Sequence, residues 1–599
     1  MSSPVVSRRR ALQLFGMGTV GAAFLAACSP SEQAQQPGKE FHGAWPYQVP
    51  PKGHFNIVVG VPDGILTGIS NGPYIDLIVP PSAMYLWKEQ KYEGLLAESW
   101  SLDAAAKTYT ITLKSGLKWS DGKPVTSKDV LTTWWVLRLI RNVGWNYIDK
   151  VEATDDRTVV FTLGNASTVF ERYALRQQIY SDATYGEWAA KARELFESGK
   201  DLDSPEGQQL NKDFQAFRPD DVIASGPFKF DTTSITNSQL TLVRNDSGYG
   251  ADKVAFSKVV LYNGETPDVT PVVLDKQIDY ATHGFPPATE KQFAASGFRI
   301  LRPPTYAGAA LYINLDKLPE FRDPRARQAL AYLIKRDEVG QVALADSGKP
   351  VKYMVGFSDL LVPAWLSAAD VAKLQTYEQS EAKATELLTA LGWKKNGDTW
   401  TKPDGTPANY ELIFHSEFAD YSATGQNVAQ QMTAFGLKTQ GRGVTYTQVP
   451  IDIQKGNFQF AIQTWGSTAH PNPHFHYTVP LFTYNYPTSA NQGGRGIGFD
   501  LKQTTSAGPI DLEAAVVAAG QGLDEAAQKA SVTKVALAFN ELLPVIPLFE
   551  RYGNNPALEG VRVEAWPPDD DPIMLNGPYA DNFTILLMYQ GRLKPAGSA

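Results

Sequence analysis

Cysteine is almost absent from this sequence, and its scarcity excludes two classes of small stabilised domain. Cys28 is the single cysteine among 599 residues. A disulfide framework needs at least two cysteines, and a cysteine zinc site needs more than one. Any stable fold here must therefore depend on hydrophobic burial, for which a chain of this length has ample residues.

Long apolar runs and basic runs are also missing from the body of the chain. Beyond residue 27 no segment approaches the ~20 unbroken apolar residues of a membrane-spanning helix. The only run of basic residues is 8–10, and the formal net charge is −8. Removing residues 1–27, which carry three Arg and no acid, gives −8 − 3 = −11. Such an acidic chain is not expected to bind nucleic acid, because neutralising phosphates requires a basic surface.

Signatures of common enzyme classes are likewise not found. The sequence contains no Gly-x-Ser-x-Gly elbow, phosphate-binding Gly-Lys-Ser/Thr loop or His-Glu-x-x-His motif. We therefore expect no catalytic residues and no cofactor. A secreted glycoside hydrolase that uses two carboxylates is the enzyme alternative.

The composition and hydrophobic patterning indicate a globular α/β protein. Hydrophobic residues make up 43% of the chain and charged residues 20%, as in ordinary soluble domains. Alternating apolar residues predict strands over 109–113 and 158–163. Helical spacing predicts helices over 126–140 and 324–339, the first opened by Thr126 and Asp129 as a capping box. Residues 514–538 are predicted to form one long or two short helices.

The N-terminus has the pattern of a bacterial export signal with a lipid-attachment site. Arginines 8–10 precede a Gly-containing apolar run, which fits a secretory signal of the twin-arginine type over residues 1–27. Leu25-Ala26-Ala27-Cys28 resembles a lipobox, in which Cys28 is acylated after cleavage. Residues 29–38 are polar and contain Pro and Gly, and we expect residues 28–51 to form a flexible tether. The alternatives left open are an ordinary signal with a chance Cys, and export by the general secretion route.

Several ordered blocks in the body resemble the family 5 solute-binding proteins of ABC importers, the oligopeptide-, dipeptide- and nickel-binding group. The blocks are residues 93–100, 107–130, 225–230, 240–245, 321–336, 391–393 and 458–466. They run in the family's order from about Phe55 to Phe549. The cluster Arg322, Arg325 and Arg327 at a helix start is interpreted as a surface salt-bridge cluster rather than a ligand site.

The resemblance implies a two-lobed α/β fold of the periplasmic-binding-protein type (class II, with an extra subdomain in lobe I). The expected division is lobe I at 52–84, 223–303 and 546–599, the extra subdomain at 85–222, and lobe II at 304–545. The expected hinge crossovers lie near 302–304 and 543–547, where the backbone would rotate while each lobe moves as a rigid body.

The function implied is that of an extracytoplasmic lipoprotein, anchored to the cell membrane, that captures an extended solute and delivers it to ABC permease subunits. An oligopeptide is the first expectation, and an oligosaccharide or another neutral polar solute is the alternative. An anchored peptide chaperone or a sensor on the same scaffold is a further reading. We expect a monomer.

One segment departs from the peptide-binding pattern and bears on the solute. In peptide-binding members the segment that follows the family's Trp carries an Asp, which pairs with the α-ammonium of the peptide. Trp465 is present here, but Thr468 or Ala469 stands at the place of the Asp. The expected ligand-binding residues in this segment are Trp465, Gly466, Ser467, Thr468 and Asn472. Plain core packing is the alternative for Trp465.

Four other residues are expected to contact solute from their places in the family pattern: Tyr74, His283, Phe285 and Tyr306. For each of them a purely structural role is the alternative. A metal site at His470, His474 and His476 is not expected, because their spacing is loose and no acidic partner accompanies them.

Overall fold

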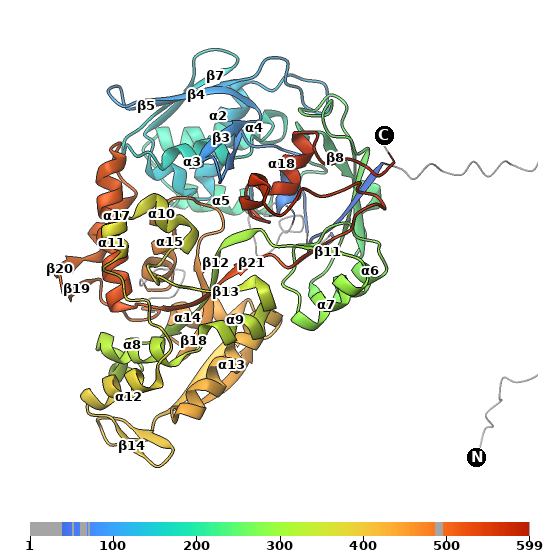
Figure 1. The fold of residues 1–599 in the computed structure, drawn as a ribbon. Helices are drawn as coiled ribbons and strands as arrows, with labels where there is room; N and C mark the ends of the chain where they lie inside the picture. The colour runs from blue at the N-terminus through green and yellow to red at the C-terminus, as the bar shows by residue number, and fades with distance from the viewer. Residues whose placement is uncertain (1–38, 51–52, 60–68, 70–71, 486–494, 598–599) are drawn as a thin grey trace, which may run out of the picture. The chain divides into compact units, whose positions relative to one another are not determined.

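The computed structural model describes residues 39–597, apart from 51–52, 60–68, 70–71 and 486–494. These residues form a mixture of helices and sheets, which confirms the expected α/β class (Figure 1). The predicted signal and Cys28 lie outside the described residues. Among the residues described, we find no helix long and apolar enough to cross a membrane.

Three larger sheets organise the chain. The first has the order β1 (Glu40–Ala44), β10 (Lys258–Tyr262), β9 (Gln239–Arg244), β8 (Phe228–Asp231). The second has the order β4 (Ala97–Asp103), β5 (Thr108–Leu113), β7 (Thr158–Thr162), β6 (Lys150–Ala153). The third, of six strands, has the order β13 (Gly348–Pro350), β21 (Ile546–Tyr552), β12 (Pro304–Ile313), β18 (Phe460–Gly466), β16 (Asn409–His415), β17 (Lys438–Val444). The smaller pairs are β2 (Ala83–Leu86) with β3 (Lys91–Gly94), β11 (Arg299–Leu301) with β22 (Asn555–Ala557), β14 (Lys394–Asn396) with β15 (Thr399–Thr401), and β19 (Lys502–Thr505) with β20 (Gly508–Asp511).

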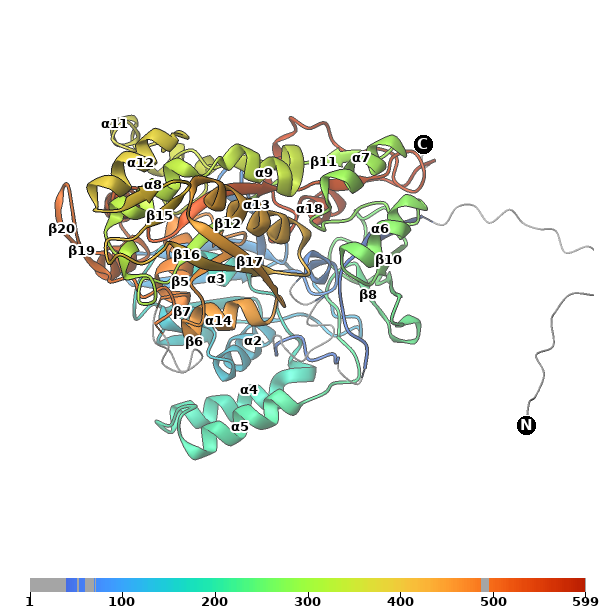
Figure 2. The ribbon, with the colours of Figure 1, turned by 90° about the horizontal axis from the view of Figure 1, so that it is seen from below.

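The helices surround these sheets. In the first half of the chain they are α2 (Ser127–Leu139), α3 (Phe170–Arg176), α4 (Asp182–Glu197), α5 (Pro205–Ala216), α6 (Thr266–Leu274) and α7 (Pro287–Ala295). In the second half they are α8 (Pro324–Leu333), α9 (Arg336–Leu344), α10 (Val362–Trp365), α11 (Ala368–Val371), α12 (Glu381–Ala390), α13 (Ala419–Phe435), α14 (Gln448–Lys455), α15 (Pro473–Thr478), α16 (Leu512–Ala519), α17 (Glu525–Leu542) and α18 (Phe583–Tyr589). Figure 2 shows α4 and α5 lying side by side.

Local sequence signals account for several of these elements. The predicted strands appear as β5 and β7, and the backbone N–H of Thr126 donates to the Asp129 carboxylate at 2.8 Å, as the capping box requires. The helix predicted over 324–339 is instead two helices, α8 and α9, because Ile334 adopts an extended conformation that ends α8. Residues 514–538 fall in two helices, α16 and α17.

The interpretation of the arginine cluster is wrong for one of its three members. Arg322 and Arg325 form exposed ion pairs with Asp316 and Asp323. Arg327 is 1% exposed, and its guanidinium donates to the carbonyl oxygens of Leu542, Leu543, Phe321 and Arg322. Unsatisfied carbonyls at the end of a helix attract a cation. Arg327 therefore fastens α8 to the C-terminus of α17.

Two neighbouring crossovers connect the sheets. The chain passes from β11 to β12 at residues 302–303 and returns from β21 to β22 at residues 553–554, and β11 pairs with β22 while β12 pairs with β21. Strand β21 thus hydrogen-bonds within the six-stranded sheet, so strand pairing changes after Tyr552 rather than at residue 545. The register of β12 against β21 shifts between Pro304 and Gly308, which marks a bulge next to the crossover.

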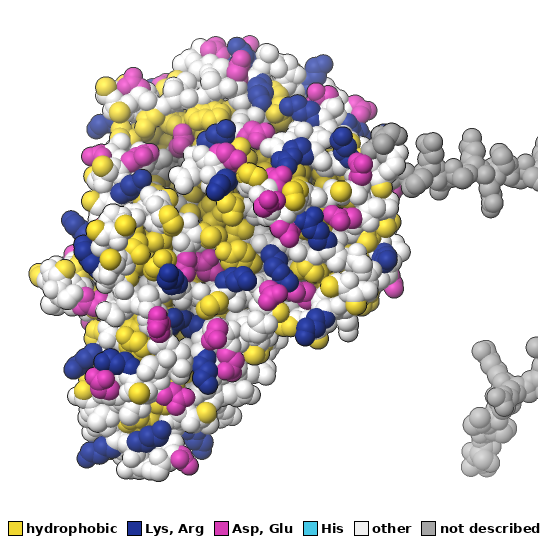
Figure 3. All heavy atoms as spheres, viewed as in Figure 1, with side chains coloured by type: hydrophobic (Ala, Val, Ile, Leu, Met, Phe, Trp, Pro, Cys, Tyr) yellow, Lys and Arg dark blue, Asp and Glu magenta, His cyan; other side chains and the backbone are white. Residues whose placement is uncertain are grey.

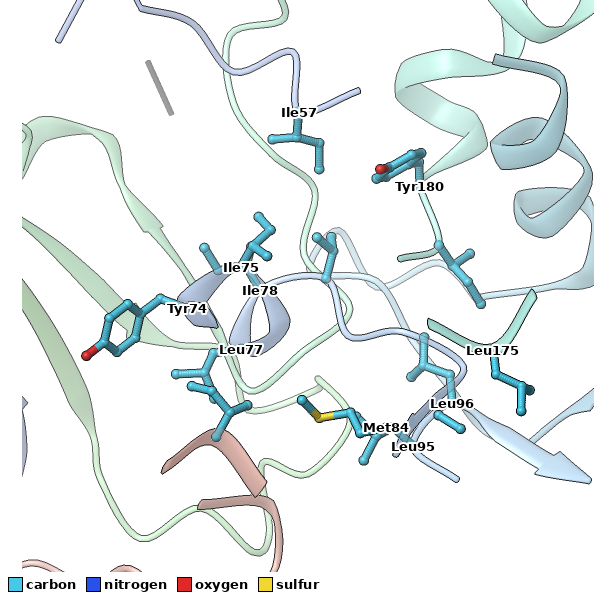
Figure 4. Close-up of a cluster of buried hydrophobic side chains, with 14 of the residues drawn as sticks. Ile57, Tyr74, Ile75, Leu77, Ile78, Met84, Leu95, Leu96, Leu175 and Tyr180 are labelled. Carbon is cyan, nitrogen blue, oxygen red and sulfur yellow. The ribbon is translucent and has the colours of Figure 1, made fainter. Parts of the chain in front are cut away.

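Two large hydrophobic cores lie on either side of these crossovers. One core is built from residues between Phe41 and Leu301 together with the C-terminal segment, and the other from residues between Tyr306 and Phe549. Figure 4 shows part of the first core, in which the Tyr74 ring extends from its short helix away from the other labelled side chains. Each core also receives one aromatic side chain from the opposite side. Trp87 packs in the second core and Phe475 in the first.

A buried ion network fastens the extra subdomain to the C-terminal segment. Arg172 Nη2 lies 2.6 Å from Asp581 Oδ2, and Arg176 bridges Asp76 at 2.5 Å and Asp581 at 3.2 Å. Asp76 and Asp581 are fully buried, and burial raises the pKa of Asp76 even though Arg176 opposes that effect. Two arginines and two aspartates balance each other, so removing one partner leaves an uncompensated charge in the interior.

Replacing Asp581 should therefore lower the free energy of unfolding strongly. The Asp581 backbone has φ +52°, a conformation that Asn tolerates, so Asp581→Asn removes the charge without forcing a new backbone. We expect a loss of about 3–5 kcal/mol in urea unfolding, the cost of breaking a buried pair. Asp121→Asn is the control, because Asp121 pairs with the exposed Lys123 and should cost less than about 1 kcal/mol. Equal losses in the two variants would contradict this account.

Candidate solute-binding site

A cavity of about 690 Å³ opens where the extra subdomain meets the six-stranded-sheet side of the molecule. Its walls come from β2, β3 and α3 on one side and from the start of β12, α10, α15 and α17 on the other. Figure 3 shows hydrophobic side chains gathered on this face between the strands labelled β4 and β5 and the helices labelled α10 and α15 in Figure 1. The volume is in the range of small-molecule sites in proteins.

Aromatic side chains dominate one wall of the cavity. They form a continuous series of ring contacts, which are Trp100–Tyr92 at 6.3 Å, Tyr92–Tyr85 at 5.0 Å, Tyr85–Trp87 at 5.8 Å and Trp87–Tyr306 at 3.9 Å. The first three are edge-to-face and the last is stacked, arrangements that aromatic quadrupoles favour. Trp365 and Phe475 complete the aromatic lining from the opposite wall.

Tyr306, an expected contact residue, connects this wall to the crossover. It lies in the bulge of β12 with φ +58°, which is unusual for a residue with a side chain. Its hydroxyl donates to the carbonyl of Leu575 at 2.8 Å, and its ring stacks on Trp87. Gly466 lies directly against it, because a Cβ at Gly466 would approach the Tyr306 carbonyl oxygen to 2.7 Å. The strained backbone of Tyr306 is thus held by contacts on three sides.

The segment after β18 contributes to the cavity less directly than its place in the family pattern predicts. Trp465 is 1% exposed and packs in the second core, where its indole N–H donates to the Phe549 carbonyl at 3.3 Å. Asn472 does line the cavity and caps α15 by accepting from the His474 N–H at 2.9 Å. Ser467 and Thr468 are half-buried in the connecting loop. Solute contact by these residues stays a prediction.

The three histidines of this segment hold the loop in place. The Ser467 N–H donates to His476 Nδ1 at 3.1 Å, so His476 Nε2 carries the hydrogen that is donated to the His470 carbonyl at 3.0 Å. His474 Nδ1 contacts the Val516 carbonyl at 2.7 Å. The His470 ring stacks on Phe475 at 3.8 Å. Burial lowers the pKa of His476 to about 4 and the pKa of His470 well below its ordinary value.

Tyr74, His283 and Phe285 lie away from the cavity. Tyr74 packs in the first core, where its hydroxyl lies against Gly43. Phe285 is fully buried, against Phe293 at 4.8 Å. His283 Nε2 contacts the Gly264 carbonyl at 2.9 Å, whereas its Nδ1 is buried without a hydrogen-bond partner among the described residues.

Gly284, next to His283, approaches a second group of polar side chains across the crossovers. A Cβ at Gly284 would lie 2.9 Å from Arg551 Nη2 and 3.3 Å from Asp420 Oδ2. Arg551 is the next-to-last residue of β21, and Asp420 is in the first turn of α13. The Tyr579 ring centroid lies 6.0 Å from the Arg551 guanidinium carbon. We call Arg551, Asp420, Gly284, Tyr579, His283 and Glu265 the polar junction.

Sequence reasoning missed most of these residues. Arg172 and Trp87 line the cavity, and Arg551 and Asp420 form the centre of the polar junction. An Arg in a strand and an Asp in the first turn of a helix carry no spacing signal, because they meet only when the sheets assemble. The one available signal was the pair Glu550-Arg551, two charged residues that directly follow the apolar run 545–549.

Comparison with known proteins identifies the family. Residues 91–486 match the family described as bacterial extracellular solute-binding proteins, family 5, middle. The chain therefore belongs to the family 5 solute-binding proteins. A relative is the oligopeptide-binding protein AppA of Bacillus subtilis, 24% identical over 489 residues that cover 78% of this chain and 82% of AppA.

Solved structures show the same two-lobed fold. A periplasmic oligopeptide-binding protein of Thermotoga maritima superposes with a TM-score of 0.74 at 17% identity, over 94% of this chain and 100% of that one. A mannohexaose-bound structure of that protein gives 0.69 at 17% identity, covering 94% and 99% of the two chains. The nonapeptide complex of Bacillus subtilis AppA gives 0.64 at 17% identity, covering 93% and 99%. These likenesses establish the fold.

Acid should destabilise this protein through its buried histidines. An unfolded His binds a proton near pH 6.5, whereas folded His476 binds one only near pH 4. Between these values the unfolded chain binds more protons, so the free energy of unfolding falls as the pH is lowered from 6.5 to 4. At ~1.4 kcal/mol per pH unit, His476 contributes about 3 kcal/mol of this loss.

The measurement is urea unfolding at pH values from 7 to 4. His476→Gln keeps one donor and one acceptor but does not titrate, so its unfolding free energy should depend less steeply on pH than that of the wild type. The same pH dependence in both proteins would show that His476 titrates normally in the fold.

Proposed function

We infer that the protein is the extracytoplasmic solute-binding lipoprotein of an ABC importer, which captures an oligopeptide between its two lobes and delivers it to the permease. The observation that carries this proposal is the cavity of about 690 Å³ with walls from both sides of the paired crossovers. A ligand bound between two bodies that move about a hinge favours the closed form, because it gains contacts with both only on closure. The protein acts as a monomer in this proposal.

The polar junction supports a peptide in particular. It places an acid and a base side by side, and each keeps hydrogen-bonding capacity that the described residues leave unused. Peptide groups bring both donors and acceptors to such a site. Several curated relatives are named as oligopeptide- or peptide-binding proteins, which is consistent with this assignment.

An oligosaccharide is the second candidate, and two observations favour it. The loop after Trp465 has no carboxylate, since Ser467, Thr468 and Ala469 follow Gly466. The cavity is lined by Tyr85, Trp87, Tyr92, Trp100, Tyr306 and Trp365. Aromatic faces offer apolar area on which flat ligands stack.

Native mass spectrometry of the freshly purified protein decides between the two solutes. Co-purifying peptides should appear as a set of bound masses spaced by amino-acid residues. Bound masses spaced by hexose or pentose units would instead establish the sugar. Addition of the identified solute should raise the melting temperature in proportion to RT ln(1 + [L]/Kd). Identical small-angle scattering profiles with and without bound solute would contradict closure of the lobes.

Membrane attachment through Cys28 is part of the proposal and has its own test. Cys28→Ala removes the thiol that the lipid would occupy, so the variant should leave the membrane fraction or accumulate as unprocessed precursor. A single acyl chain gives only marginal membrane binding, so stable anchoring needs more than one chain. Unchanged fractionation of the Cys28→Ala variant with the membrane would rule out this mode of anchoring. Cys28→Ser is a second variant that lacks the thiol, and it should behave in the same way as Cys28→Ala.

A further inference from the structure

The central pair of the polar junction is an ion pair that is incompletely hydrogen-bonded. Arg551 Nε lies 3.7 Å from Asp420 Oδ2, which is beyond a hydrogen bond. The Arg551 guanidinium donates no hydrogen bond to any of the described residues. Asp420 is 3% exposed, and its Oδ2 has no hydrogen-bond partner among the described residues, while its Oδ1 accepts the Tyr421 N–H at 3.0 Å. Buried polar groups are usually satisfied, so this unused capacity points to a missing ligand.

The pair lies where the two sides of the crossover meet. Arg551 is one residue from the end of β21, directly before the chain crosses to β22. On the other side Gly284 approaches both members of the pair, and its lack of a side chain leaves their polar atoms uncovered at that point. A solute group placed between Gly284 and this pair would therefore touch both sides of the crossover.

A second carboxyl group and a histidine lie near the pair. Burial raises the pKa of Glu265, an effect that the nearby Arg551 opposes. Burial, with a contribution from Arg551, lowers the pKa of His283 to about 4, so this ring is neutral at pH 7. Arg551 interacts electrostatically with the carboxyl groups of both Asp420 and Glu265. Asp420 Oδ2 beside it is a buried acceptor that a donor group of a solute can fill.

We propose that Asp420 and Arg551 recognise the amino terminus of a peptide, with the α-ammonium on Asp420 Oδ2 and the carbonyl oxygen of the first residue on the Arg551 guanidinium. The ammonium nitrogen and carbonyl oxygen of one residue are about 3 Å apart by covalent geometry, which fits the 3.7 Å between Asp420 Oδ2 and Arg551 Nε. The three ammonium donors need the acceptor that Asp420 leaves free, and the carbonyl accepts from the unused guanidinium N–H groups.

This assignment rests on the proposed peptide-binding function and supplies a group that the loop after Trp465 lacks. Thr468 and Ala469 offer no carboxylate there. Asp420 offers one from a different element, the first turn of α13. Because Asp420 is buried in this form, the peptide terminus reaches it when the lobes separate about the crossovers, and closure then buries the ion pair away from water.

The test compares peptides that differ only at the amino terminus. The probe is a mixed tri- to nonapeptide pool with free amino termini, and its counterpart is the same pool after N-acetylation, each titrated into the wild-type protein by calorimetry. Acetylation removes the positive charge and should weaken binding about tenfold to a hundredfold, the range for losing a hydrogen bond to a charged group. Asp420→Asn should bind both pools with similar affinity.

Two matched variants separate this effect from general damage to the fold. Asp316→Asn removes an exposed carboxylate of the same lobe, which pairs with Arg322 at 3.0 Å, and should keep the wild-type preference for free amino termini. Gly284→Ala keeps all the charges but places a methyl group against Arg551 and Asp420, and should weaken binding of the free pool. If Asp420→Asn does not fold, the wild-type comparison of the two pools still decides the question.

The outcomes distinguish this inference from the proposed function. Equal binding of free and acetylated pools by the wild type would overturn the role of Asp420 and leave peptide binding intact. Binding of mannohexaose with no binding of either pool would overturn the peptide function itself, and with it this inference. A preference for free termini that disappears in Asp420→Asn and persists in Asp316→Asn would establish the assignment.

Discussion

The pairing of the two crossovers is the constraint on which the arrangement of this molecule depends. The chain runs from β11 into β12 and returns from β21 into β22, and backbone hydrogen bonds join β11 to β22 and β12 to β21. Rotation about one crossover must therefore be matched by rotation about the other, because strand ladders resist independent movement of their members. The bulge at Tyr306 and the charged residue Arg551 both lie within a few residues of this point. The cavity wall and the polar junction therefore both lie next to the paired crossovers.

The extra subdomain is held to both sides of that hinge. Buried ion pairs fasten α3 to the C-terminal segment through Asp581. On the other side, Thr168 N donates to the Gly522 carbonyl at 3.1 Å, and Gly522 N donates to the Ala166 carbonyl at 3.0 Å. Phe475 and Trp87 are exchanged between the two cores. The subdomain thus forms a wall of the cavity and also contacts the elements on its opposite side.

Local signals predicted elements better than they predicted the site. The alternation at 109–113 and the capping box at Thr126 and Asp129 correspond to β5 and α2, because both depend on residues close in sequence. Arg327 was misassigned because its partners, the carbonyls of Leu542 and Leu543, come from the far end of another helix. Trp465 lies in a strand inside the six-stranded sheet and its indole packs in the second core, which depends on how the sheet assembles rather than on local sequence. Solute contact by Trp465 stays a prediction.

Charge decides more about the solute than aromatic area does. The aromatic cavity wall would stack equally well on a sugar ring, an aromatic side chain or a peptide plane, since all offer flat surfaces. The polar junction is more selective, because it offers a buried acceptor on Asp420 next to the N–H donors of Arg551. A vicinal diol could donate to Asp420 and accept from Arg551, but its hydroxyl donor is neutral. An ammonium donor forms the stronger, charge-assisted hydrogen bond to a carboxylate. In the proposed mode of binding, closure of the lobes around this junction is therefore favoured most by a solute that carries a positive charge beside a carbonyl oxygen.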